Sequence, residues 1–168
     1  VDKKHRRAVS FDYNALFERE VEYGYSGLEK PSLDLKLQIR SLDDGNIICE
    51  LDRALLLSAH PSKSRYQDCE VWLQHPKFSP NGEKILFVIR SQKNNSKVES
   101  DLYIYDMITG QITCALEWSD WKRGGHHPVW LDNTDILMNV RNRVGEPLSM
   151  VRFSCYRDNY HIISSGII

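Results

Sequence analysis

The sequence lacks the features that identify the commonest classes of chemistry and location. Its four cysteines, Cys49, Cys69, Cys114 and Cys155, include no CxxC pair and no metal-type spacing. Free thiols and a reducing compartment are therefore expected. No stretch of about 18 apolar residues occurs, so the sequence predicts no membrane span. GxSxG, Walker and glycine-rich dinucleotide motifs are also missing, so no motif names a reaction.

An excess of charge of either sign is lacking as well. The chain has 22 basic and 23 acidic residues, well mixed, and a net charge of −1. A nucleic-acid partner requires a basic surface that neutralises phosphates, so the sequence argues against one. We interpret the single basic run, residues 3–7, as a solvated charged segment.

What the sequence does contain is a series of short β-strand patterns between Trp72 and Leu116. Pro80-Asn81-Gly82 predicts a tight turn, because proline presets φ and asparagine and glycine tolerate positive φ. The apolar run 85–89 that follows is typical of a strand buried on both faces. Residues 102–107 alternate with period two, and a turn leads from them into a return strand. This stretch therefore predicts one four-stranded antiparallel sheet.

Two halves of this pattern recur elsewhere in the chain. Six residues of the second half align at a constant offset with six upstream: Leu102, Ile104, Gly110, Ile112, Cys114 and Leu116 with Leu37, Ile39, Gly45, Ile47, Cys49 and Leu51. From the first half, His75-Pro76-x-Phe78 aligns with His127-Pro128-x-Trp130, about 50 residues later, and propeller blades repeat every 40–50 residues or so. Residues 7–16 add strand character upstream. The sequence therefore predicts an all-β fold, a β-propeller fragment of about three four-stranded antiparallel blades at about 7–52, 71–118 and 126–166.

The number of predicted blades is too small to close a propeller. A closed propeller has about 4–8 blades, more than the three expected here. The expectation is that the rest of the propeller comes from a longer chain, with self-association as the alternative.

Histidines are the first candidates for a functional site. His75 and His127 occupy equivalent positions at the start of a blade's innermost strand, so they should converge at one end of the central channel. Together with His126 and Gln74 they could hold one transition-metal ion, because imidazole suits such metals. Alternatively, each histidine hydrogen-bonds the backbone of a neighbouring blade. His60 and His161 have no equivalents, and we interpret them as surface or hairpin residues.

Cationic and aromatic residues are the second set of candidates. Arg90 and Arg141 end equivalent strands, and with Lys122 and Arg123 they could recognise a carboxylate. The alternative is that they are solvated strand ends. Trp121 could stack on a sugar ring or pack between blades.

Two motifs carry a resemblance to a known superfamily. His75-Pro-x-Phe-Ser-Pro-Asn-Gly-x-x-Ile-Leu-Phe and Asp101-Leu-Tyr-Ile-Tyr-Asp-x-x-Thr-Gly110 resemble the repeat of TolB-type propellers, which are similar to WD-repeat propellers. The pattern is most similar to the oligogalacturonate-lyase branch. Members of that branch bind a divalent metal, typically manganese, through His and Gln at the channel and cleave acidic oligosaccharides by β-elimination. The resemblance thus makes His75 and His127 (or His126) metal-ligand candidates. The chain also looks like bacterial propellers of this superfamily for which no activity is implied.

Two functions follow as expectations. The first is a propeller module that binds a saccharide or a protein at the mouth of its channel, with no assigned reaction. The second is part of a metal-dependent polysaccharide lyase acting on acidic oligosaccharides, with a side-chain base removing the proton next to a uronate carboxylate. The superfamily also includes propeller domains of prolyl-oligopeptidase-like peptidases, a third class that would need a hydrolase domain elsewhere.

Overall fold

A computed structural model describes residues 1–20, 22, 34–121, 125–141, 146–156 and 161–166. These residues form three antiparallel sheets and three short helices, which confirms the all-β fold class. No helix in the described part of the chain is long and apolar enough to cross a membrane. All four cysteines are free thiols, as expected.

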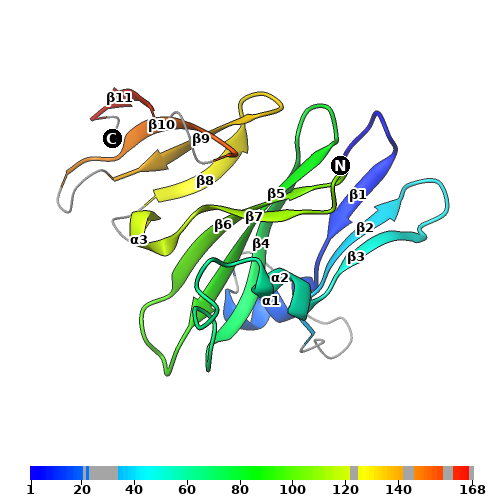
Figure 1. Ribbon diagram of the computed structural model, residues 1–168, viewed down its shortest axis with the longest axis horizontal. Helices are drawn as coiled ribbons and strands as arrows, with labels where there is room; N and C mark the ends of the chain where they lie inside the picture. The colour runs from blue at the N-terminus through cyan, green and yellow to red at the C-terminus, as the bar shows by residue number, and fades with distance from the viewer. Residues whose placement is uncertain (21, 23–33, 122–124, 142–145, 157–160, 167–168) are drawn as a thin grey trace.

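Each sheet is formed by strands that are consecutive in the sequence (Figure 1). The sheets comprise β1 (Arg7–Ser10), β2 (Leu37–Ser41) and β3 (Ile47–Leu51); β4 (Glu70–Phe78), β5 (Lys84–Gln92), β6 (Glu99–Asp106) and β7 (Ile112–Leu116); and β8 (Gly125–Trp130), β9 (Asp135–Val140), β10 (Ser149–Ser154) and β11 (His161–Ser165). The helices are α1 (Tyr13–Arg19), α2 (Arg53–Ser58) and α3 (Trp118–Trp121).

The sheet β4–β7 confirms the four-stranded antiparallel unit predicted between Trp72 and Leu116. Gly82 adopts a φ of 75° in the predicted turn between β4 and β5. The Ser79 amide closes this turn by donating to the Lys84 carbonyl at 2.8 Å. The positive φ of Gly82 thus helps to set the start of β5, as the sequence indicates.

Strand β5 lies between two hydrophobic cores, because alternate side chains point to opposite faces. Ile85, Phe87 and Ile89 pack with residues of β2 and β3, including Leu37 and Leu51. On the other face, Leu86 and Val88 pack with residues of the third sheet, such as Ile136, Met138 and Phe153. The apolar run is therefore buried on both faces, as predicted, and the β4–β7 sheet lies between the other two (Figure 1).

One predicted strand is partly wrong. Residues 7–16 were expected to be extended, but β1 ends at Ser10 and α1 begins at Tyr13. Asp12 starts this helix, because its Oδ1 accepts a hydrogen bond from the Ala15 amide at 3.1 Å. The alternating apolar residues before Asp12 favour a strand, so the pattern did not indicate that Asp12 caps a helix.

The first strands of the three sheets are neighbours, since β1 contacts β4 and β4 contacts β8. Hydrogen bonds between described residues join β4 to β8. Lys77 Nζ donates to the Pro128 carbonyl, and Trp130 Nε1 donates to the Lys77 carbonyl, both at 3.0 Å. The junction between β4 and β8 is where the predicted histidines lie.

Candidate functional site

The structure brings His75 and His127 together at the β4–β8 junction. Their ring centroids lie 5.7 Å apart, with an angle of 68° between the ring planes. His75 is half-buried and His127 is exposed. The repeat alignment therefore located two imidazoles that lie side by side although they belong to different sheets.

Matching backbone irregularities position the two rings. Register shifts occur between Gln74 and Lys77 in β4 and between His126 and Val129 in β8. His75 and His127 lie within these bulges at positive φ, 53° and 58°. The proline after each histidine cannot donate to the ladder, which favours a bulge. Residues other than glycine rarely adopt positive φ, and such strain is concentrated at functional sites.

A buried polar cluster lies directly behind His75. The Glu20 carboxylate, just after α1, accepts hydrogen bonds from Trp72 Nε1 at 2.8 Å, Gln74 Nε2 at 2.5 Å and Arg90 Nη1 at 2.5 Å. The Gln74 side chain is fully buried, and its Oε1 has no hydrogen-bond partner among the described residues. The sequence offers no signal for Glu20, because nothing near α1 recurs elsewhere in the chain.

Burial lowers the pKa of His75 to about 4, and the positive charges of Lys77 and Arg90 and the neighbouring His127 add to this effect. The Glu20 carboxylate opposes the shift but does not reverse it. The His75 imidazole is therefore neutral at neutral pH, the form that binds a metal or exchanges hydrogen bonds with a ligand. Burial also lowers the pKa of the Lys77 ammonium.

A cavity of about 190 Å³ opens beside this cluster. It is lined by Phe11, Tyr13, Leu16, Gln74, His75 and Pro76. The Phe11 and Tyr13 rings are stacked, with centroids 4.4 Å apart. Aromatic walls combined with a few polar groups are typical of small-molecule sites.

The other predicted site residues are placed differently. The Arg90 guanidinium is paired with Glu20, and Arg141 donates from Nη1 to the Glu146 carbonyl. Trp121 is buried in the second core. Lys122, Arg123 and the His126 side chain lie outside the described residues.

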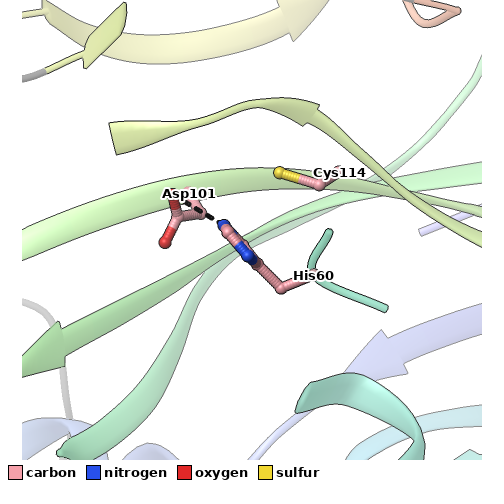
Figure 2. Close-up of side chains that lie close together, drawn as sticks. All are labelled: His60, Asp101 and Cys114. Atoms are coloured by element: carbon pink, nitrogen blue, oxygen red, sulfur yellow. Dashed lines mark ion pairs between the residues drawn. The ribbon is translucent and has the colours of Figure 1, made fainter. Parts of the chain in front are cut away.

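A second cluster was not predicted. His60, Asp101 and Cys114 are all buried, and their ligand-type atoms lie within 4.8 Å of one another (Figure 2). His60 comes from the loop after α2, Asp101 from β6 and Cys114 from β7. The expectation that His60 is a surface or hairpin residue is wrong, since it is only 3% exposed. These three residues could hold a metal ion.

Asp101 is the centre of this cluster. Its Oδ1 accepts from the Trp118 amide at 2.6 Å, and its Oδ2 accepts from Tyr66 Oη at 2.9 Å and pairs with Arg65 Nη2 at 2.8 Å. Burial raises the pKa of the Tyr66 phenol far above its ordinary value, and the Asp101 charge adds to that shift. Tyr66 is therefore a permanent hydrogen-bond donor. The sequence contained one sign that Asp101 is buried. Asp101, Tyr103 and Tyr105 are alternate residues of β6 and therefore lie on the same face of the sheet, and the two tyrosines face the first core.

No protein-family model matches the chain, and no curated protein matches it either.

Proposed function

We propose that this protein is a β-sheet module that binds an acidic saccharide at the β4–β8 junction, with His75 and His127 at the centre of the site. The observation that carries the proposal is the pair of imidazoles, which lie in equivalent bulges of two sheets. Their ring centroids are 5.7 Å apart. Both histidines lie at positive φ within these bulges, and backbone strain of this kind is concentrated at functional sites, which favours a role in binding.

The charges around the pair favour an anionic ligand. Lys77 and Arg90 both lower the pKa of His75, so both contribute positive potential at the imidazole. The Lys77 ammonium has three donors, and the Pro128 carbonyl takes one of them. A ligand carboxylate would meet a half-buried cation and two imidazole nitrogens there. In a partly buried site such charge-assisted hydrogen bonds are stronger than in water.

The adjoining cavity favours a sugar as the rest of the ligand. The stacked Phe11 and Tyr13 rings offer an apolar surface beside the polar atoms of Gln74 and His75. Aromatic rings pack against the apolar face of a pyranose, while the polar groups fix its orientation. A uronic acid has both the ring and the carboxylate.

Binding of a short oligogalacturonate, followed by calorimetry, tests this proposal. The wild-type chain should bind the acidic oligomer and not an uncharged oligosaccharide of the same length. His127→Gln should weaken binding at least tenfold, because it removes an exposed imidazole without disturbing a core. His161→Gln, a change at an exposed histidine on β11, is the matched control and should leave affinity unchanged. Equal binding of charged and uncharged oligomers, or no binding of either, would overturn the proposal.

A second candidate is metal-dependent β-elimination, and the unpartnered Gln74 Oε1 favours it. His75, His127 and this oxygen are donor types that first-row transition metals accept, and together they would hold the ion in this second function. Such an ion, manganese by the resemblance, would polarise the uronate carboxylate. In this function His75 and His127 would bind the metal ion and orient the uronate. The base that accepts the proton is not assigned.

The lyase assay follows the ultraviolet absorbance of unsaturated uronate when oligogalacturonate is incubated with the protein and Mn²⁺. A metal-dependent rise that His127→Gln abolishes and His161→Gln leaves intact would establish this second function. Binding without any such rise would leave the binding module as the function.

A further inference from the structure

The buried cluster formed by His60, Asp101 and Cys114 is separate from the histidine pair, and its interpretation does not rest on the proposed function. We infer that these three residues form a zinc-type metal site that fastens the loop after α2 to strands β6 and β7. Figure 2 shows the three side chains directed toward one another from these segments.

The distances fit one small ion. His60 Nε2 lies 3.8 Å from Asp101 Oδ1, and all three ligand-type atoms lie within 4.8 Å of one another. Two nitrogen or oxygen ligands of a tetrahedral zinc ion, each about 2.1 Å from the metal, are roughly 3.4 Å apart. The His60–Asp101 pair would need shifts of about 0.2 Å per ligand to reach this spacing, and a pair at the 4.8 Å limit would need about 0.6–0.7 Å per ligand.

An unpartnered buried nitrogen provides the second observation. Nε2 of His60 is completely enclosed and has no hydrogen-bond partner among the described residues. The Asp101 carboxylate that it faces is too far away for a direct hydrogen bond, at 3.8 Å. Leaving such a group unsatisfied costs about 1–3 kcal/mol. A cation between Nε2 and the carboxylate removes this deficit.

The neighbouring groups are those that orient metal ligands. His60 Nδ1 accepts a hydrogen bond from the Ser62 amide at 3.0 Å and also lies 3.2 Å from the Ser62 carbonyl oxygen. The amide contact favours a proton on Nε2 in the metal-free chain. In the metal-bound form the proton would lie on Nδ1, which would donate to the Ser62 carbonyl, and Nε2 would have its lone pair free for the ion. The Trp118 amide and the Tyr66 hydroxyl hold the two oxygens of Asp101 in place. Second hydrogen bonds of this kind are the usual support of ligating imidazoles and carboxylates.

The charges also balance around a divalent ion. Arg65 bridges Asp101, at 2.8 Å, and Glu99, at 2.9 Å. With the Cys114 thiol ionised, a divalent ion is neutralised by the Cys114 thiolate and the Asp101 carboxylate, while Arg65 is neutralised by Glu99. Metal binding would release the thiol proton to solvent.

The donor types select the class of metal. One thiolate, one imidazole and one carboxylate suit zinc and related transition metals, whereas magnesium and calcium prefer oxygen donors only. His60 comes from the loop after α2, whereas Asp101 and Cys114 come from the paired strands β6 and β7, so a bound ion would tie this loop to the central sheet in the folded state. We assign the site a structural role on that ground.

Titration of the metal-free chain with Co²⁺, a spectroscopic stand-in for zinc, tests the inference. We expect a thiolate-to-cobalt charge-transfer band that saturates at one ion per chain and disappears on addition of Zn²⁺. Cys114→Ala should abolish the band. Cys49→Ala is the matched control, because Cys49 is the repeat equivalent of Cys114 and is not part of the cluster. His127→Gln should keep the band, which separates this site from the one at the β4–β8 junction.

A second measurement covers the case in which Cys114→Ala does not fold. In the wild-type chain, Zn²⁺ should raise the midpoint of thermal unfolding by several degrees and protect Cys114, but not Cys69, from alkylation mapped by mass spectrometry. An absent thiolate band, a band that survives in folded Cys114→Ala, or Cys114 alkylation that Zn²⁺ leaves unchanged would each show an ordinary hydrogen-bonded core and overturn the inference.

Discussion

At the scale of single residues, burial decides the chemistry of His75. Its imidazole is half-buried beside two cations, so the folded protein holds it in the neutral form at neutral pH. The unfolded chain has an ordinary histidine there, with a pKa of about 6.5. The two states therefore differ in protonation between roughly pH 6.5 and the folded pKa of about 4.

This difference predicts a pH-dependent stability. As the pH falls through that window the unfolded state binds more protons, so the free energy of unfolding decreases. His75→Gln, which cannot titrate, should show a shallower decrease than the wild type. Urea denaturation at a series of pH values from 7 to about 4 measures it, with His161→Gln as the control. Parallel curves for the wild type and His75→Gln would contradict the prediction.

Glu20 is the second residue with a decisive role, because it is the acceptor for three partly buried donors. Glu20→Gln removes the negative charge and leaves the Arg90 guanidinium without its ion-pair partner. We expect a loss of about 1–3 kcal/mol in the free energy of unfolding, measured by urea denaturation. The control is Glu18→Gln on the exposed side of α1, which should change stability by less than about 0.5 kcal/mol. Similar losses for both variants would disprove the role of Glu20.

The two clusters show which parts of a site a sequence reveals. His75 and His127 were predictable because they occupy one position of a repeat, and repeats place equivalent residues alike. His60 was not predictable, since its proline- and serine-rich surroundings are typical of a surface loop. Its burial depends on the packing of that loop against β6, a contact between distant segments that no local pattern encodes.

At the scale of elements, the turn between β4 and β5 also anchors the N-terminal segment. Arg7 donates from Nη2 to the Gly82 carbonyl at 2.7 Å and pairs with Asp2. A Cβ atom at Gly82 would lie 2.4 Å from Asp2 Oδ2, 2.7 Å from His5 Nδ1 and 2.8 Å from Arg7 Nη2. The turn therefore needs glycine for space as well as for its positive φ.

Gly82→Ala should consequently destabilise the protein more than Gly110→Ala. Both glycines have positive φ, 75° and 71°, so both variants incur about 1–2 kcal/mol of backbone strain. A Cβ at Gly110 meets nothing within 4 Å, whereas Gly82→Ala must displace the Asp2–Arg7 pair, at a further cost of about 1–3 kcal/mol. Thermal unfolding of the two variants makes the comparison, and equal midpoints would contradict this account.

The elements also differ in how far the sequence specified them. Strand β5 was predictable, since five consecutive apolar residues after a turn admit few interpretations. The start of helix α1 was not predictable, because the cap at Asp12 directly follows an alternating apolar pattern that favours a strand.

At the scale of the whole molecule, the central sheet couples the two cores. Alternate residues of β5 belong to one core or the other, so neither core can open without exposing a face of the same strand. The first strands of the three sheets also lie side by side. A propeller would place its innermost strands in this way.

Coupling through β5 predicts that the molecule unfolds in one step. Met138, 1% exposed, lies in the second core, and Met138→Ala should lower the free energy of unfolding by about 2–5 kcal/mol. Because the cores share β5, far-UV circular dichroism and tryptophan fluorescence should shift together and keep coincident transitions. Ile162→Ala, at a side chain 53% exposed on β11, is the control and should change stability by less than about 0.5 kcal/mol. Separate transitions in Met138→Ala would instead show that the third sheet unfolds independently of the first core.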